Sequence, residues 1–133
     1  MDPLPTVLLK PGEADRIVAG HPWIYRGEIL RLTQPGGGDA SSPASATRAS
    51  RLPADGELVQ VKDHRQRFLG IGFFNARSKI NVRVLSPERV EINEPFFEAR
   101  IRAALDVRRR HLPTATSFRA VNAESDFLSG LIV

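Results

Sequence analysis

The spacing of apolar residues changes once along this chain, at Pro95, and the change divides the sequence into two parts. Before Pro95, apolar and polar residues alternate, most regularly over residues 80–85. A period of two buries one face of a β-strand. After Pro95 the period is about 3.6, which predicts a helix with one apolar stripe. We therefore predict a β domain over residues 1–94 and the beginning of a second domain over residues 95–133.

The first part contains five runs with strand-like composition and one short helix-like segment. The predicted strands cover residues 6–10, 23–32, 57–62, 68–75 and 80–85, and the predicted helix covers residues 13–19. Short strands at close spacing are typical of a small barrel. In the second part, residues 118–123 and 130–133 are expected to start a β-hairpin after the long helix. The expected fold class is α+β.

Residues 33–56 have almost no large apolar side chain and are rich in Gly, Ser, Ala and Pro. Such a segment cannot bury enough apolar surface to offset the entropy lost on ordering. We predict a flexible insertion there. The chain also lacks a basic N-terminal region and any apolar run of about 20 residues, which predicts a cytoplasmic protein with no membrane partner.

The basic residues are unevenly distributed along the chain, whose formal net charge is +4. Between residues 62 and 83 six basic residues face one acid, Asp63. Such a strip fits a phosphate backbone, although it equally fits the solvated face of a sheet. Within it, Arg77, Ser78 and Lys79 lie in a polar turn that either only connects two strands or also contacts phosphate.

Three other features have a structural and a functional interpretation. Trp23 is interpreted as the core anchor of the barrel, and His21 either caps the helix end or donates to a phosphate. Gly70 and Gly72 lie inside a strand and not before a helix, which favours close packing over cofactor binding. The three histidines are too scattered to predict a metal site.

Four motifs together indicate a family. They are Lys-Pro-Gly-Glu at 10–13, His-Pro-Trp at 21–23, Phe-Asn-x-x-Ser at 74–78 and Glu-Ser-Asp-x-Leu-x-Gly-Leu at 124–131. Over nearly its whole length, the chain resembles the PUA-linked class I methyltransferases that modify C5 of cytosine in large-subunit ribosomal RNA. Ser129 departs from the proline that is usual in that family.

The resemblance implies an RNA-binding barrel, and it adds residues near the first helix to the candidate RNA site. The candidate site then comprises Lys10, Arg16, His21, Arg26, Arg77, Ser78 and Lys79. The implied partner is large-subunit ribosomal RNA, the implied cofactor of the whole protein is S-adenosylmethionine, and homo-oligomer formation stays open. Glu124 and Asp126 are taken as structural.

The chain itself is expected to have no catalytic residue and to bind no cofactor. It contains no cysteine, whereas the usual route to C5 methylation needs a thiolate that adds to C6. The apolar run 131–133 reads as a buried strand that needs further neighbours, as in the front part of a larger protein. Two alternatives remain: a stand-alone RNA- or ribosome-binding domain, and the barrel of another RNA-modifying enzyme such as a pseudouridine synthase, which the Glu-Ser-Asp motif disfavours.

Overall fold

The computed structural model describes residues 2–35 and 52–133. The chain divides after Arg89 into two compact units. We call the part before this point the sheet unit and residues 90–133 the helical unit. The boundary predicted at residues 93–94 lies a few residues farther along the chain. No helix in the described ranges is long and apolar enough to cross a membrane.

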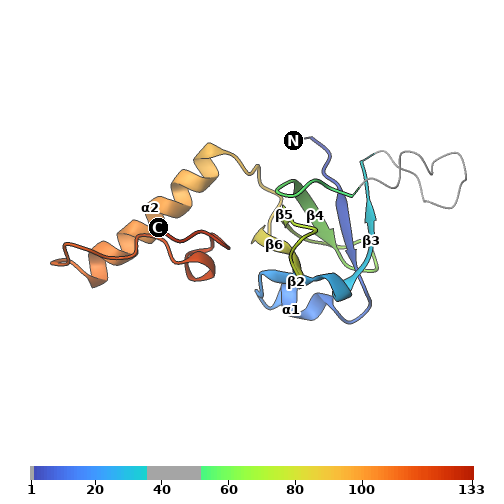
Figure 1. The fold of residues 1–133 in the computed structure, drawn as a ribbon, viewed down its shortest axis with the longest axis horizontal. Coiled ribbons are helices and arrows are strands. Elements are labelled where there is room, and N and C mark those ends of the chain that lie inside the picture. The colour runs from blue at the N-terminus through green and yellow to red at the C-terminus, as the bar shows by residue number, and fades with distance from the viewer. Residues whose placement is uncertain (1, 36–51) are drawn as a thin grey trace, which may run out of the picture. The chain divides into compact units, whose positions relative to one another are not determined.

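The sheet unit is built on one six-stranded sheet (Figure 1). Its strands are β1 (Thr6–Leu9), β2 (Trp23–Tyr25), β3 (Ile29–Thr33), β4 (Leu58–Lys62), β5 (Phe68–Phe74) and β6 (Ile80–Ser86). They lie in the order β2-β6-β5-β4-β1-β3, and β1 and β4 are parallel while the other neighbours are antiparallel. The short helix α1 (Ala14–Val18) follows β1, close to its predicted range, and contributes Ile17 to the core.

The prediction of one strand over residues 23–32 is wrong. This segment forms β2, the 3₁₀ turn η1 (Arg26–Glu28) and β3, and the two strands lie at opposite edges of the sheet. The chain turns because the Glu28 carboxylate accepts the Tyr25 backbone N–H at 2.7 Å and caps η1. The sheet consequently has six strands and not the five that were predicted.

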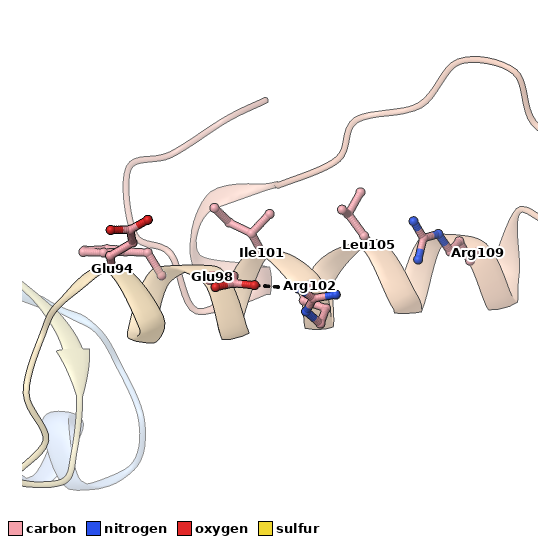
Figure 2. Close-up of a pocket in the computed structure, with 7 residues that line it drawn as sticks. Glu94, Glu98, Ile101, Arg102, Leu105 and Arg109 are labelled. Carbon is pink, nitrogen blue, oxygen red and sulfur yellow. Dashed lines mark hydrogen bonds and ion pairs between the residues drawn. The ribbon is translucent and has the colours of Figure 1, made fainter.

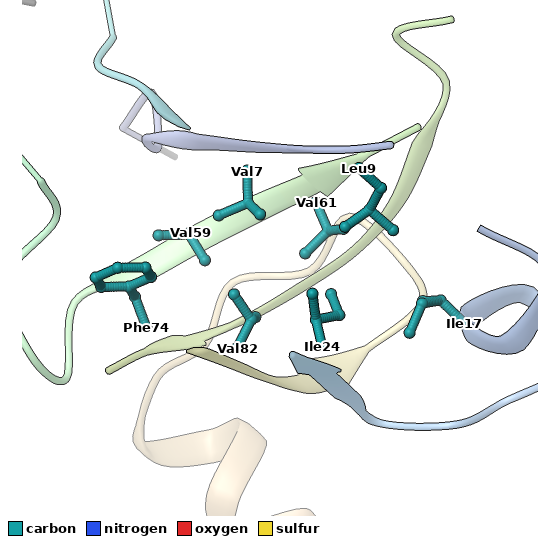
Figure 3. Close-up of a cluster of buried hydrophobic side chains, with 8 residues drawn as sticks. All are labelled: Val7, Leu9, Ile17, Ile24, Val59, Val61, Phe74 and Val82. Atoms are coloured by element: carbon teal, nitrogen blue, oxygen red, sulfur yellow. The ribbon is translucent and has the colours of Figure 1, made fainter. Parts of the chain in front are cut away.

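One apolar cluster forms the core of the sheet unit (Figure 3). Its members are Val7, Leu9, Ile17, Ile24, Val59, Val61, Phe74 and Val82. The interpretation of Trp23 as core anchor is wrong, because successive strand residues point to opposite faces and the fully buried residue of β2 is Ile24. Trp23 is half-buried, and the Arg83 guanidinium lies 5.6 Å from the centroid of its ring.

The close-packing interpretation of Gly70 and Gly72 is confirmed. A Cβ added at Gly72 would lie 2.3 Å from the Arg83 carbonyl oxygen, and one at Gly70 would lie 2.7 Å from the Ser86 carbonyl oxygen. These glycines therefore allow β5 to approach β6. The flexible insertion predicted at 33–56 falls mainly on residues 36–51, which lie outside the described residues. At its two ends, Thr33 is the last residue of β3 and Asp55 lies in a turn.

The helical unit consists of α2 (Glu94–His111), the 3₁₀ turn η2 (Ala123–Asp126) and the chain around them. The Asn93 side chain caps α2 by accepting the Phe96 N–H at 3.1 Å, and Pro95 lies in the first turn, which confirms the predicted start. The core is small and consists of Ala104, Val121 and Leu128, with Phe97 packed against it.

A buried ion pair supplements this small core. Arg108 donates to both carboxylate oxygens of Asp126, at 2.5 and 2.7 Å, and its Nε donates to the Arg119 carbonyl at 2.9 Å. The Arg108 hydrogen bond lowers the pKa of Asp126 and outweighs the opposing effect of burial, and the Asn122 N–H makes a smaller contribution in the same direction. Asp126 thus has the structural role assigned to it from the sequence.

The predicted C-terminal hairpin is formed only in part. Residues 120–123 and 131–133 exchange backbone hydrogen bonds around one antiparallel bridge, Asn122 to Ile132. The run 131–133 was expected to be buried but is exposed, with Ile132 at 61% and Val133 at 64%, because its side chains lie outside the small core.

Candidate nucleic-acid interface

Two of the predicted RNA-binding cations lie against η1. The Lys10 ammonium donates to the Gly27 carbonyl at 2.7 Å. Arg16, on α1, pairs with Glu28 and lies with its guanidinium 5.7 Å from the centroid of the Tyr25 ring. Since Glu28 also caps η1, one carboxylate holds both the backbone turn and the Arg16 side chain in place.

The turn 75–79 joins β5 to β6 and is fixed by its own side chains. Asn75 accepts the Arg77 N–H at 2.9 Å, and Ser78 Oγ accepts the Ile80 N–H at 3.1 Å. The buried amide of Asn81 donates to the carbonyls of Asn75 and Ser78. Ser78 is therefore engaged in shaping the turn, while the backbone presents Arg77 and Lys79 at its surface.

Arg26 connects these two places. Its backbone N–H donates to the Lys79 carbonyl at 3.0 Å, and its guanidinium donates to the Ala76 carbonyl at 2.6 Å. Residues far apart in the sequence thus form one surface. We call it the η1–turn surface and define it as Lys10, Arg16, Arg26, Arg77, Ser78 and Lys79.

The cations of the η1–turn surface differ in how firmly they are held. Arg77 is 90% exposed and lies 3.2 Å from the Asp55 carboxylate, itself 39% exposed, and such surface pairs contribute little to stability. Arg16 pairs with a Glu28 side chain that is only 16% exposed. The Lys79 ammonium has no hydrogen bond or ion pair among the residues described. Arg77 and Lys79 are hence the cations that can most easily reorient toward an anion.

His21 is exposed, and its ring lies against the start of β2. Its Nδ1 accepts the Trp23 N–H at 3.2 Å, and its ring lies edge-on to the Trp23 ring at 5.8 Å between centroids. The His21 backbone N–H also donates to the carbonyl of Arg16 at 3.0 Å, so His21 contacts the η1–turn surface through its backbone and not through its ring.

Sequence reasoning missed the residues that organise this surface. Asp55 accepts the Ala76 N–H at 2.8 Å in addition to pairing with Arg77, and Glu28 caps η1. Glu28 follows Tyr25 at the spacing of a capping box, but Tyr25 is not one of the residues (Ser, Thr, Asp or Asn) by which such a box is recognised in a sequence. The predicted basic strip is also not continuous: Lys62, Arg65 and Arg67 precede β5, whereas Arg77 and Lys79 follow it.

A groove lies along α2 in the helical unit (Figure 2). Phe97, Ile101 and Leu105 supply its apolar floor, and a Glu98–Arg102 ion pair lies beside them. All its lining residues belong to α2, so it is one face of a helix. Within the described residues, no group of three His, Cys, Asp or Glu side chains could hold a metal ion.

Comparison with known proteins relates the sheet unit to a family. The model of the PUA-like domain family matches residues 7–87. A "Ribosomal RNA large subunit methyltransferase I" of Pseudoalteromonas translucida is 30% identical over 96% of this chain and 28% of its own length. A "Ribosomal RNA large subunit methyltransferase" of Deinococcus radiodurans is 31% identical over 86% of this chain and 26% of its own length. The chain thus spans little more than a quarter of these relatives.

A solved structure shares the fold. It is described as a SAM-dependent methyltransferase of Streptococcus mutans and aligns with 96% of this chain and 29% of its own, with a TM-score of 0.68 at 17% identity. Together with the family match, this agreement identifies the sheet unit as a small, mostly β half-barrel. The chain belongs to the PUA-like domain family, and its relatives are methyltransferases of large-subunit ribosomal RNA.

Proposed function

We propose that this chain binds large-subunit ribosomal RNA through the η1–turn surface. The observation that carries the proposal is the pair of Arg26 hydrogen bonds, which join the cations beside η1 to those of the turn 75–79. A phosphate backbone is held by several cations at fixed positions, supported by hydroxyl and backbone donors. The η1–turn surface offers these groups on a rigid sheet, in a member of the PUA-like family.

The whole protein is proposed to be a cytoplasmic S-adenosylmethionine-dependent methyltransferase that modifies C5 of cytosine in large-subunit rRNA. Support comes from the relatives, which are named as ribosomal RNA large subunit methyltransferases, and from their length, of which this chain spans little more than a quarter. Because the chain contains no cysteine, it cannot supply the thiolate of the usual C5 route. We assign methyl transfer and cofactor binding to another part of that protein, and RNA binding to this chain.

RNA titrations of the 133-residue chain at several salt concentrations test the RNA-binding proposal. The variant Arg77→Ala with Lys79→Ala should bind single-stranded RNAs of unrelated sequence more weakly than the parent. Its slope of log affinity against log salt should be shallower by about 1.4, at about 0.7 for each lost phosphate contact.

The matched control is Arg102→Ala with Arg109→Ala on α2. It removes the same formal charge from two exposed arginines, each of which lies beside a carboxylate as Arg77 does. The control should bind RNA as the parent does. Equal losses in the two double variants would indicate diffuse attraction and not a docked site, and parental binding by both would reject the η1–turn surface.

A further inference from the structure

The hairpin between β4 and β5 presents a second group of cations. We call residues 62–67 the β4–β5 tip; they are Lys62, Asp63, His64, Arg65, Gln66 and Arg67. The side chain of Asp63 is buried inside the tip at 1% exposure, while residues 64–67 are exposed. The tip therefore exposes Arg65 and Arg67, leaves Lys62 half-buried and buries its single acid.

Asp63 holds the shape of the tip. Its Oδ1 accepts the backbone N–H groups of Arg65 and Arg67, each at 2.9 Å, and its Oδ2 accepts Arg67 Nε at 2.6 Å. Burial by itself raises the pKa of Asp63, but these hydrogen bonds outweigh it and leave the pKa below its usual range. Since the carboxylate stays ionised and internally bonded, the tip has a fixed backbone.

The tip also contains a strained residue. Gln66 has φ 67°, in the left-handed region that a residue other than glycine seldom adopts. Such strain persists only where surrounding contacts enforce it, and it is concentrated at functional sites. Here the enforcing contacts are the Asp63 hydrogen bonds and the Gln66 N–H to Asp63 carbonyl bond at 3.0 Å.

The structure of the tip explains the presence of Asp63 and Arg67 but not that of two further cations, Lys62 and Arg65. Among the residues described, the Lys62 ammonium and the Arg65 guanidinium have no hydrogen bond or ion pair. A hairpin closed by Asp63 needs neither of them. Side chains of this kind on a rigid turn are suited to phosphate contacts.

The position of the tip relates it to the η1–turn surface. The tip comes directly before β5, and the turn 75–79 comes directly after it, so the two basic turns lie at opposite ends of one strand. At about 3.3 Å per residue, β5 places them about 20 Å apart. We propose that the β4–β5 tip is a second phosphate-contacting surface, and that one RNA molecule bound at the η1–turn surface also reaches Lys62 and Arg65.

This inference rests on the proposed RNA binding, and one set of titrations separates the two. The probe is a single-stranded RNA of about 16 nucleotides, the upper end of common single-strand site sizes, added to the 133-residue chain. In the double variant Lys62→Ala with Arg65→Ala, the slope of log affinity against log salt should become shallower by about 1.4. When Arg77→Ala and Lys79→Ala are combined with these two changes, the slope should become shallower by about twice that amount. Arg102→Ala with Arg109→Ala is again the control.

A second variant distinguishes a shaped tip from diffuse charge. Asp63→Asn makes the chain more positive but places an amide N–H against Arg67 Nε, which disturbs the tip. We expect it to bind RNA more weakly than the parent although it carries one negative charge less. Tighter or unchanged binding would contradict a shaped site, and if this variant fails to fold, Lys62→Ala with Arg65→Ala decides alone.

The remaining outcomes are also decisive. Two RNA molecules bound per chain would reject a single RNA that spans both turns. Should the turn variant lose affinity while the tip variant binds as the parent does, the tip assignment fails and the proposed function stands. A parent chain that binds no RNA overturns both.

Discussion

The sheet unit and the helical unit differ in the size of their cores, and one arginine–aspartate pair from each unit shows two different uses of the same charges. The sheet unit buries a broad apolar cluster, and its Arg77–Asp55 pair lies at the surface. The helical unit buries only a few small or medium side chains, and its Arg108–Asp126 pair lies inside, with exposures of 15% and 7%. The same two residue types thus have different roles in these two pairs.

This difference shows why charge alone does not mark a binding site. A buried, bidentate pair with every oxygen bonded holds neighbouring segments together, and its charges are unavailable to a ligand. An exposed pair with one contact contributes little to stability and exchanges partners easily. By this criterion, Arg108 of α2 is a structural residue, whereas Arg77 of the sheet unit remains available to a ligand.

The largest expected effect is on the core of the sheet unit. Ile24→Ala removes a fully buried side chain and should cost about 2–5 kcal/mol of unfolding free energy, because the cavity is surrounded by well-packed strands. Trp23→Ala, at the neighbouring half-buried position, should cost less. Thermal melting followed by circular dichroism compares the two variants. A larger loss of stability in Trp23→Ala than in Ile24→Ala would show that Trp23 belongs to the core.

Gly72→Ala tests the close approach of β5 to β6. The new methyl group would meet the Arg83 carbonyl oxygen at 2.3 Å, and backbone cannot yield as a flexible side chain does. Overpacking of this kind typically costs about 1–3 kcal/mol. Gly27→Ala is the matched control, because a Cβ there meets nothing within 4 Å. Denaturant titration followed by the fluorescence of Trp23, the only tryptophan, reports on the sheet unit; equal stability of the two variants would contradict the close approach.

Acid should act on the helical unit through Asp126. The pKa of Asp126 is lowered in the folded state, so its contribution to stability is present above its ordinary pKa of about 3.9 and is lost as pH falls through the lower folded value. Asp126→Asn should weaken the helical unit at neutral pH and flatten its response below about pH 4. Helical circular dichroism measured against pH tests this prediction. If the variant lost helix at the same acidic pH as the parent, a group other than Asp126 would be responsible for the acid response.

The features that were predicted correctly depend on neighbours in the sequence. Alternation is local, and it located β4, β5 and β6; the start of α2 needed only Pro95 and a period of 3.6. The break at η1 was missed because Glu28 is held by Arg16, twelve residues away. Trp23 was assigned to the core because of its size. Side chains alternate between the two faces of β2, however, and Ile24 is the residue that points into the core, so Trp23 points to the other face.

The candidate site shows the same limit. The turn 75–79 was recognisable from its Asn and Ser, and its cations from the composition. Its connection to η1 was not recognisable, because Arg26 meets Ala76 across fifty residues of sequence, and such a contact follows from strand order and not from any local pattern. For the same reason, the basic strip could not be resolved into two turns before the position of β5 was known.

The smallest expected effect concerns the start of α2 and affects the helical unit alone. Asn93 accepts the Phe96 N–H, which otherwise has no partner within the first turn of the helix. Asn93→Ala removes this acceptor and should cost about 1 kcal/mol. Asn93→Asp keeps an acceptor at the same place and adds a negative charge at the positive end of the helix dipole, so it should keep or slightly raise stability. Urea titration followed by helical circular dichroism and by Trp23 fluorescence separates the units. If Asn93→Ala lowered the transition midpoint seen by Trp23 fluorescence as much as the midpoint seen by helical circular dichroism, the two units would unfold together. The contrast between a sheet unit that is stable by itself and a helix that depends on its cap and its ion pair would then be wrong.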